Sequence, residues 1–151
     1  MSGKRRILAV ASGGGHWQQM MLVREAFIGH EVHFATTLLG LPEQFGATPA
    51  TVIPDCNRDQ KLRVLACLVA TVRLMARLRP DVVISTGALP GVIALAVGRA
   101  MGARTVWLDS VANAEEMSMS GRLARRFAHL WLSQWAHVAR AEGADYAGAV
   151  L

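Results

Sequence analysis

Residues 6–17 read R-I-L-A-V-A-S-G-G-G-H-W, and this stretch decides the fold. The segment Arg6–Ala11 is short and almost entirely apolar, which is typical of a strand buried on both faces of a sheet. Three glycines follow it, and the segment Trp17–Phe27 then has the composition of a helix. A buried strand, a glycine turn and a helix in this order predict the first unit of an open α/β sheet.

The same alternation continues along the chain. Further short strands are predicted at Glu31–Ala35, Thr51–Ile53, Asp81–Ser85, Arg104–Leu108 and His129–Leu132. Helices are predicted at Gln60–Leu78, Leu89–Met101 and Ser120–Ala128, and a loop at Thr37–Ala50. Apolar strands that alternate with helices indicate a parallel sheet covered on both faces. Because such crossovers are right-handed, we expect a doubly wound, Rossmann-like α/β domain over residues 1–139 and an Ala/Gly-rich tail over residues 140–151.

Composition limits the class of protein. The 151 residues suit one domain, and no apolar run reaches the ~20 residues that span a bilayer. A signal peptide is not expected, because the apolar run after Lys4–Arg6 is too short. The net charge of +5 favours a phosphorylated substrate or an anionic membrane. Nucleic acid is not expected, because no nucleic-acid-binding motif accompanies the basic residues. The two cysteines lack metal-ligand spacing, so no metal is expected.

The glycine loop Ser12-Gly13-Gly14-Gly15 lies where open α/β sheets bind ligands. Glycines let a ligand approach the main chain, and the start of a helix favours an anion. The loop matches neither the dinucleotide pattern G-x-G-x-x-G nor a Walker A loop, and no cofactor is expected. These four residues therefore predict a phosphate or pyrophosphate site. The alternative is a tight turn between strand and helix that binds no ligand.

His16 follows the glycine loop directly. A neutral imidazole suits a general base that removes the proton from a sugar hydroxyl, which makes His16 a candidate catalytic residue. The alternative is a histidine that caps the helix or contacts phosphate without transferring a proton.

Loops after the fourth and fifth strands should reach the same edge, because the carboxyl ends of parallel strands lie together. Thr86 and Gly87 suit contacts to phosphate or sugar, or a simple cap of the next helix. Asp109 and Ser110 follow the fifth strand, and Glu115 comes soon after. Asp109 is expected either to act in catalysis by orienting the histidine or holding a sugar, or to form a local Asx-turn. Ser110 and Glu115 are candidate substrate ligands.

The segment Lys61–Arg79 carries five cations and no acid, and its apolar residues cover more than one side of the predicted helix. Basic flanks with excess apolar surface are typical of helices that lie on a membrane. Each cation near an anionic leaflet adds on the order of 1 kcal/mol of binding. Arg73, Arg77 and Arg79 are therefore predicted membrane contacts. The alternative is a core crossover helix with a solvated arginine edge.

Several blocks of sequence together resemble a known family. The glycine loop with His16 resembles that of acceptor domains in GT-B glycosyltransferases, including the peptidoglycan enzyme that makes lipid II. The later blocks are V-I-S-T-G at 83–87, T-V-W-L-D-S at 105–110, S-M-S-G-R-L at 118–123 and L-S-Q-W at 132–135. Their order, over residues 6 to about 138, resembles the PssD-type family of exopolysaccharide and capsule transferase subunits. Its eukaryotic relative is the membrane-anchoring subunit of the two-part enzyme that adds the second GlcNAc to dolichol-pyrophosphate-GlcNAc.

The resemblance implies one half of a GT-B glycosyltransferase, equivalent to the N-terminal half that binds the acceptor. That acceptor would be a polyprenyl-pyrophosphate-linked sugar, with the glycine loop and His16 facing its pyrophosphate and attacking hydroxyl. A separate PssE-type chain would bind the UDP-sugar, and residues 140–151 are a candidate contact with that chain. The implied protein is a subunit of a heterodimer in polysaccharide biosynthesis, cytoplasmic and peripheral on the inner face of the cell membrane.

Two features depart from the family pattern. Eukaryotic members have an N-terminal transmembrane anchor, whereas none is expected here. Residues 85–91 read S-T-G-A-L-P-G, where relatives often have N-G-P-G. Two other functions stay open: a subunit that recruits the catalytic chain to the membrane without a catalytic group of its own, and a nucleotide-binding regulator that acts alone.

Overall fold

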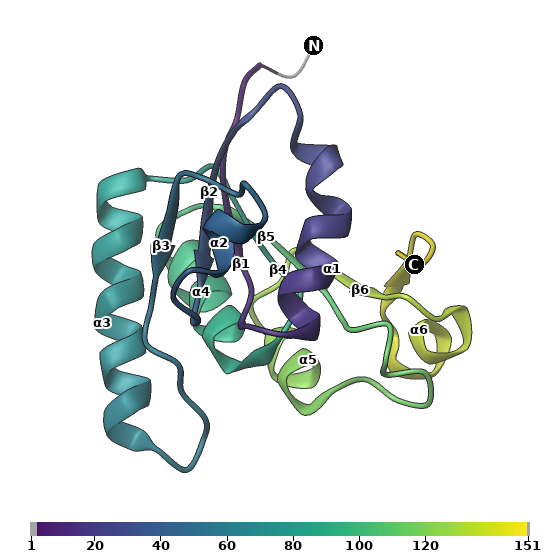
Figure 1. Ribbon diagram of the computed structural model, residues 1–151. Helices are drawn as coiled ribbons and strands as arrows, with labels where there is room; N and C mark the ends of the chain where they lie inside the picture. The colour runs from purple at the N-terminus through teal and green to yellow at the C-terminus, as the bar shows by residue number, and fades with distance from the viewer. Residues whose placement is uncertain (1–2, 151) are drawn as a thin grey trace.

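The strands form one parallel sheet in the computed structural model, which describes residues 3–150 (Figure 1). The order across the sheet is β3-β2-β1-β4-β5-β6-β7. The strands are β1 (Arg6–Val10), β2 (Glu31–Thr36), β3 (Ala50–Val52), β4 (Val82–Ser85), β5 (Arg104–Leu108), β6 (Leu130–Ser133) and β7 (Asp145–Tyr146). The helices are α1 (Gly15–Val23), the 3-10 helix η1 (Arg24–Phe27), α2 (Leu41–Gln44), α3 (Lys61–Leu78), α4 (Ala88–Ala100), α5 (Met119–Ala124) and α6 (Ala136–Glu142).

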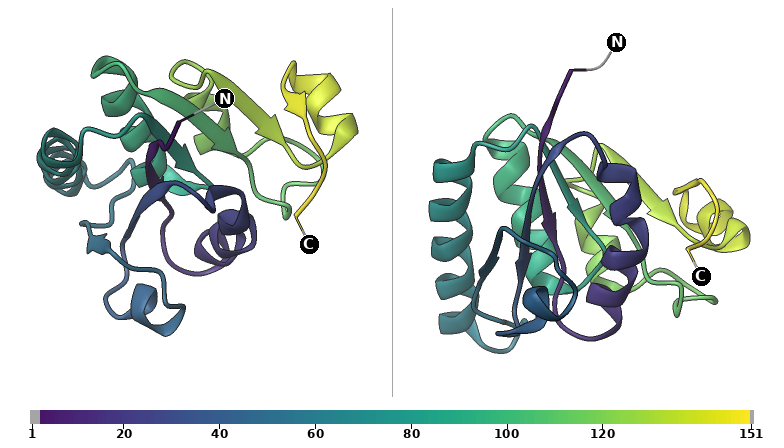
Figure 2. Two further views of the ribbon diagram at one scale, coloured as in Figure 1. Left: turned by 90° about the horizontal axis from the view of Figure 1, so that it is seen from above. Right: turned by 45° about the horizontal axis from the view of Figure 1, so that its top comes forward.

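Strand β1 is buried on both faces, as its apolar sequence predicts. Leu8 and Val10 belong to the core beneath α3 and α4, while Ile7, Ala9 and Ala11 belong to the core beneath α1. Side chains alternate between the two faces of a strand, so one apolar run serves both cores. Figure 2 shows the two helical layers on opposite sides of the sheet. The doubly wound α/β fold predicted from the sequence is confirmed.

The direction of winding reverses at β1. The chain moves from β1 to β2 and β3 on one side, and then returns through α3 to β4 on the other side. β1 therefore pairs with both β2 and β4, with Ala9 beside Phe34 on one flank and beside Ile84 on the other. Loops that leave neighbouring strands in opposite directions open a crevice at such a switch point, where α/β sheets bind ligands.

Residues 140–150 do not form the tail that their composition predicts. Helix α6 runs across residue 140 and ends at Gly143, whose φ is 76°, and the chain then adds β7 to the sheet beside β6. Leu151 lies outside the described residues. Residues 37–50, predicted as a loop, contain the four-residue helix α2 and the first residue of β3. The helices and strands in both segments are too short to give a periodic apolar pattern in the sequence.

Candidate active site

His16 and Thr86 join the loops after β1 and β4 across the switch point. The His16 Nδ1 atom lies 3.1 Å from the backbone carbonyl oxygen of Thr86. In return, the buried Thr86 hydroxyl donates to the backbone carbonyl of His16 at 2.6 Å. Two reciprocal hydrogen bonds therefore hold the histidine at the crevice. Thr86, a predicted substrate ligand, contacts His16 through both its carbonyl and its hydroxyl.

The contact with a carbonyl decides which ring nitrogen of His16 is free. A carbonyl oxygen can only accept, so Nδ1 must carry the hydrogen in this contact. In the neutral imidazole, Nε2 then has the unshared electron pair and can accept a proton. A ring that is oriented through Nδ1, and whose Nε2 has no hydrogen-bond partner within residues 3–150, is suited to general base catalysis.

Gly87 leaves the space in which the His16 ring lies. A Cβ atom built on Gly87 would come within 2.0 Å of His16 Nδ1, and the φ of this glycine is 154°. Gly87 is predicted as a substrate ligand. The structure also shows that a larger residue here would displace the His16 ring. Its backbone N–H donates to Ser85 Oγ at 3.2 Å, which fixes the entry to α4.

The N-terminus of α1 has no side-chain cap. Gly14 is the N-cap residue, with φ 81° and ψ −138°, and both Gly14 and Gly15 are exposed. Helix α5, in contrast, is capped by Ser118, whose hydroxyl accepts from the Gly121 N–H at 2.8 Å. The first amide groups of a helix lack partners inside the helix, and an uncapped, exposed start is suited to an anion.

The rest of the glycine loop is anchored to its surroundings. The Gly13 N–H donates to Thr37 Oγ1 at 3.3 Å, and a Cβ on Gly13 would lie 3.3 Å from that of Leu38. Ser12 is buried. Of the four residues predicted for the phosphate site, Gly14 and Gly15 are therefore the two most open to solvent.

Asp109 does not orient His16, and the structure corrects that expectation. Its carboxylate is 2% exposed. Oδ1 accepts from Trp107 Nε1 at 3.0 Å and from the Ser118 hydroxyl at 2.6 Å. Oδ2 accepts from the Ser118 N–H at 2.9 Å and from Asn113 Nδ2 at 3.1 Å. These four hydrogen bonds hold the loop after β5. They do not form the Asx-turn that was the alternative, because the Val111 N–H donates to Gln19 and not to Asp109.

Two buried glutamines, which the sequence patterns alone did not assign, connect α1 to this loop. Gln19 Nε2 donates to Ser110 Oγ at 2.9 Å, and Gln19 Oε1 accepts from the Val111 N–H at 3.2 Å. Gln134 Nε2 donates to the Asp109 carbonyl at 2.9 Å and also contacts Gln19 Oε1. The L-S-Q-W block at 132–135 contains Gln134, and this glutamine holds the loop after β5 to α1.

The predicted ligands on the loop after β5 differ in accessibility. The Ser110 hydroxyl accepts hydrogen bonds from Gln19 Nε2 at 2.9 Å and from the Ala112 N–H at 3.2 Å. Glu115 is exposed on the same loop. The structure thus brings His16, Thr86 and Gly87 together, joins Ser110 to α1 through Gln19, and leaves Glu115 at the surface.

Helix α3 presents apolar side chains to solvent. Leu62 is 83% exposed and Leu65 55%, and Leu68, Val69 and Val72 are also exposed. The predicted membrane contacts Arg73, Arg77 and Arg79 are exposed on the same helix or at its end. Within residues 3–150, no helix is both long enough and apolar enough to cross a membrane.

No protein-family model and no curated protein sequence matches the chain. Solved structures do match its fold. MurG from Acinetobacter baumannii is 16% identical with a TM-score of 0.72, over 86% of this chain and 41% of that one. A UDP-GlcNAc 2-epimerase from Neisseria meningitidis, solved with UDP-GlcNAc bound, is 10% identical with a TM-score of 0.70, over 91% and 42%. A glycosyltransferase from Rickettsia africae is 10% identical with a TM-score of 0.67, over 97% and 43%.

These likenesses establish the fold. The chain has the α/β, Rossmann-like architecture found in GT-B glycosyltransferases and in the epimerases that share it. It spans less than half the length of each of these three proteins. At identities this low, the likeness concerns the arrangement of the sheet and helices alone.

Proposed function

We propose that the chain is the acceptor-binding subunit of a two-part glycosyltransferase. It would hold a polyprenyl-pyrophosphate-linked saccharide at the membrane, while a separate PssE-type chain would supply the UDP-sugar. The observation that carries this proposal is the pairing of His16 with the Thr86 carbonyl beside the uncapped start of α1. The uncapped start of α1 suits an anion, and His16 suits the removal of a proton.

The chemistry follows from these two groups. The amide groups at Gly14 and Gly15 bind the pyrophosphate of the acceptor, helped by the positive end of the helix. His16 Nε2 accepts the proton of the acceptor hydroxyl as its oxygen attacks the anomeric carbon of the sugar. The bond from that carbon to the UDP oxygen breaks, and UDP leaves with the electron pair. Asp109 takes no part in proton transfer and keeps the neighbouring loop in place.

The two-part organisation is supported by the sequence blocks. Both transferases and epimerases share the fold, so the fold does not select between them. The order of the later sequence blocks, which resembles the PssD-type subunits, favours the transferase. The exposed apolar residues and arginines of α3 support binding to a membrane surface.

Reconstitution tests the division of labour. The purified chain, its candidate donor-binding partner and the mixture are assayed for UDP release with a polyprenyl-pyrophosphate-linked sugar. We expect turnover only in the mixture. Full transferase activity in the isolated chain would refute the two-part proposal, and acceptor-independent epimerisation of UDP-GlcNAc would indicate the other activity found on this fold.

The variant His16→Ala separates a catalytic subunit from a recruiter. Loss of a general base lowers the rate by roughly 10²-fold or more, so activity of the mixture should fall by that amount while the complex still forms. His137→Ala, which changes a histidine on α6, is the matched control. Unchanged activity in His16→Ala would favour the recruiter, and acceptor-independent nucleotide binding by the chain alone would favour a regulator.

Liposome co-sedimentation tests the membrane face. Vesicles with and without anionic lipid are compared for the wild-type chain and for Arg73→Glu/Arg77→Glu. Each cation near an anionic surface adds about 1 kcal/mol, so the double reversal should weaken binding by at least tenfold. Arg126→Glu/Arg140→Glu makes the same change in charge away from α3. Equal binding by both double variants would exclude the α3 face as the contact.

A further inference from the structure

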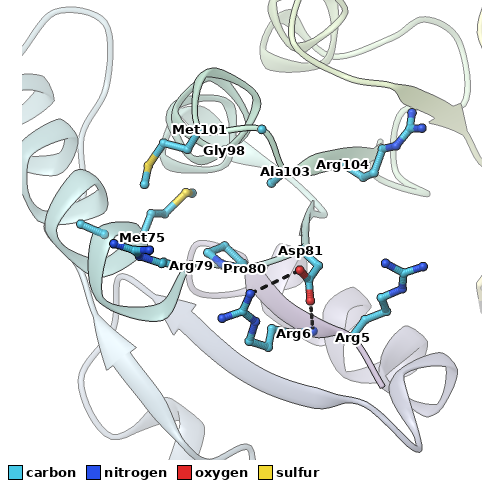
Figure 3. Close-up of a pocket in the computed structure, with 12 residues that line it drawn as sticks. Arg5, Arg6, Met75, Arg79, Pro80, Asp81, Gly98, Met101, Ala103 and Arg104 are labelled. Atoms are coloured by element: carbon cyan, nitrogen blue, oxygen red, sulfur yellow. Dashed lines mark hydrogen bonds and ion pairs between the residues drawn. The ribbon is translucent and has the colours of Figure 1, made fainter. Parts of the chain in front are cut away.

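A basic cleft lies at the amino-terminal edge of the sheet, away from the glycine loop. Its volume is about 640 Å³, which is within the range of small-molecule sites. Residues before and at the starts of β1 and β5 form one side, and the ends of α3 and α4 form the other (Figure 3). Four arginines line it: Arg5, Arg6, Arg79 and Arg104.

One carboxylate in the cleft is already engaged. Asp81 Oδ2 accepts from the backbone N–H of Arg6 at 2.8 Å, and its Oδ1 accepts from the Arg6 guanidinium at 3.5 Å. Glu31, at the start of β2, pairs with Lys4 at 3.5 Å. Within residues 3–150, the guanidinium groups of Arg5, Arg79 and Arg104 form no ion pair.

The ends of α3 and α4 offset only part of the positive charge. The last carbonyl groups of α3 and α4 carry partial negative charge, but several are capped. The Arg79 N–H donates to the Met75 carbonyl at 2.8 Å, and the Ala103 N–H donates to the Gly98 carbonyl at 2.9 Å. Cations unneutralised by acids within a concave site attract anions more strongly than cations on a convex surface.

The cleft also has an apolar wall. Met75 is fully buried behind it, Ala103 is 4% exposed, and Met101 is 49% exposed at the rim. Figure 3 shows both methionines on the same side as Arg79, facing the side where Arg5 and Arg104 lie. A ligand that used the whole cleft would combine an anionic group with an apolar part.

We propose that this cleft binds a phosphate ester, with its phosphate held by Arg5 and Arg104. Guanidinium groups match phosphate oxygens with paired hydrogen bonds, and arginine is the preferred residue for this contact. The apolar part of the ligand packs on Met101. Such a ligand is either an anionic phospholipid or a soluble phosphorylated molecule. The site is separate from the glycine loop, and the inference does not depend on transferase activity.

Nuclear magnetic resonance titration of the labelled chain tests this site directly. The amide signals of Gly98 and Gly102, which line the cleft, are followed during addition of glycerol 3-phosphate and, separately, of short-chain phosphatidylglycerol below its micelle concentration. We expect saturable shifts at both glycines. Binding of the lipid at least tenfold tighter than glycerol 3-phosphate would identify a phospholipid site, and equal affinities would identify a soluble phosphate.

The double variant Arg5→Gln/Arg104→Gln provides the decisive comparison. Both side chains are exposed and lie outside α3, so the variant should fold normally and keep the proposed membrane face. We expect at least a tenfold loss of affinity in the cleft and unchanged signals at Gly14 and Gly15. Arg58→Gln/Arg140→Gln removes the same charge elsewhere and should bind as the wild type does. Shifts that never saturate, or equal affinity in both double variants, would overturn the proposal.

Discussion

Gly87 and His16 act as a pair at the scale of single residues. The imidazole occupies the space where any larger residue at position 87 would place its Cβ atom, 2.0 Å from Nδ1. A ring that must move cannot keep its hydrogen bond to the Thr86 carbonyl. Gly87→Ala therefore disturbs the candidate base without removing it.

We expect Gly87→Ala to lower the activity of the reconstituted enzyme on the order of 100-fold, because misplacing a catalytic group by about 1 Å costs that much. The loss is measured from steady-state rates, and circular dichroism checks that the variant is folded. Gly29→Ala is the control, since Gly29 also has a positive φ, 90°, but no atom lies within 4 Å of its added Cβ. It should lose about 1 kcal/mol of stability and keep its activity. Wild-type activity in Gly87→Ala would contradict the assigned position of His16.

We expect the two cysteines to be unreactive, because both thiols are buried. Burial raises the pKa of the Cys56 thiol to about 12, and burial also raises the pKa of Cys67. Thiolates are the reactive form, so on the order of one Cys56 in ten thousand is reactive near pH 8. Ellman's reagent should therefore label neither cysteine in the native chain and both in denaturant. Rapid labelling of one thiol in the native chain would contradict this burial.

At the scale of elements, strand ends were predictable and side-chain direction was not. The sequence correctly predicted that the loops after β1, β4 and β5 lie at one edge of the sheet. It could not tell that Asp109 turns inward, because the four hydrogen bonds that hold its carboxylate come from groups up to nine residues away. Apolar periodicity likewise found α3 and α4 but missed α6 and β7, whose Ala-rich segment has almost none.

Gln134 connects three elements of the site. Its amide donates to the Asp109 carbonyl and contacts Gln19 on α1, and its Oε1 accepts from the Val150 N–H at 2.7 Å. Gln134→Ala leaves buried polar groups without partners, each at a cost of about 1–3 kcal/mol. We expect a total loss of about 2–4 kcal/mol in urea unfolding.

The control for this prediction is Gln18→Ala, on the exposed side of α1 next to the buried Gln19. Its loss should stay below about 0.5 kcal/mol. Equal stability of the two variants would show that the glutamine contacts do not hold the loop after β5 to α1 and the C-terminal segment.

At the scale of the whole molecule, the switch point made the location of the site predictable. The first apolar strand with its glycines, and the alternation of strands and helices after it, predicted the doubly wound sheet and the edge that holds the candidate site. The cleft at the opposite edge was not predictable, because its four arginines come from three separate places in the sequence and none of them forms a motif. Only the parallel register of β1, β4 and β5 brings their starts together.

Asp81 ties the starts of these three strands to one another. Its backbone N–H donates to the Arg6 carbonyl on β1 at 2.8 Å, and its carboxylate accepts from the Arg6 N–H. Its carbonyl accepts from the Arg104 N–H at 2.9 Å. The Arg6 N–H, and then the Arg6 guanidinium, hold the pKa of the Asp81 carboxyl below its ordinary 3.8. Because the pKa is lower in the folded chain, the carboxylate stabilises the fold above pH 3.8, and this contribution disappears as the pH falls through the lowered value.

Asp81→Asn should therefore lower the urea midpoint near neutral pH, and its difference from the wild type should shrink as the pH falls below 3.8. Protonation of Asp81 in the wild type removes the same charge that the substitution removes. Asp59→Asn, which takes a charge from an exposed loop with no ion pair within residues 3–150, should change the midpoint far less near neutral pH. A difference between Asp81→Asn and the wild type that stays constant down to low pH would mean that the charge on Asp81 does not hold this edge of the sheet together.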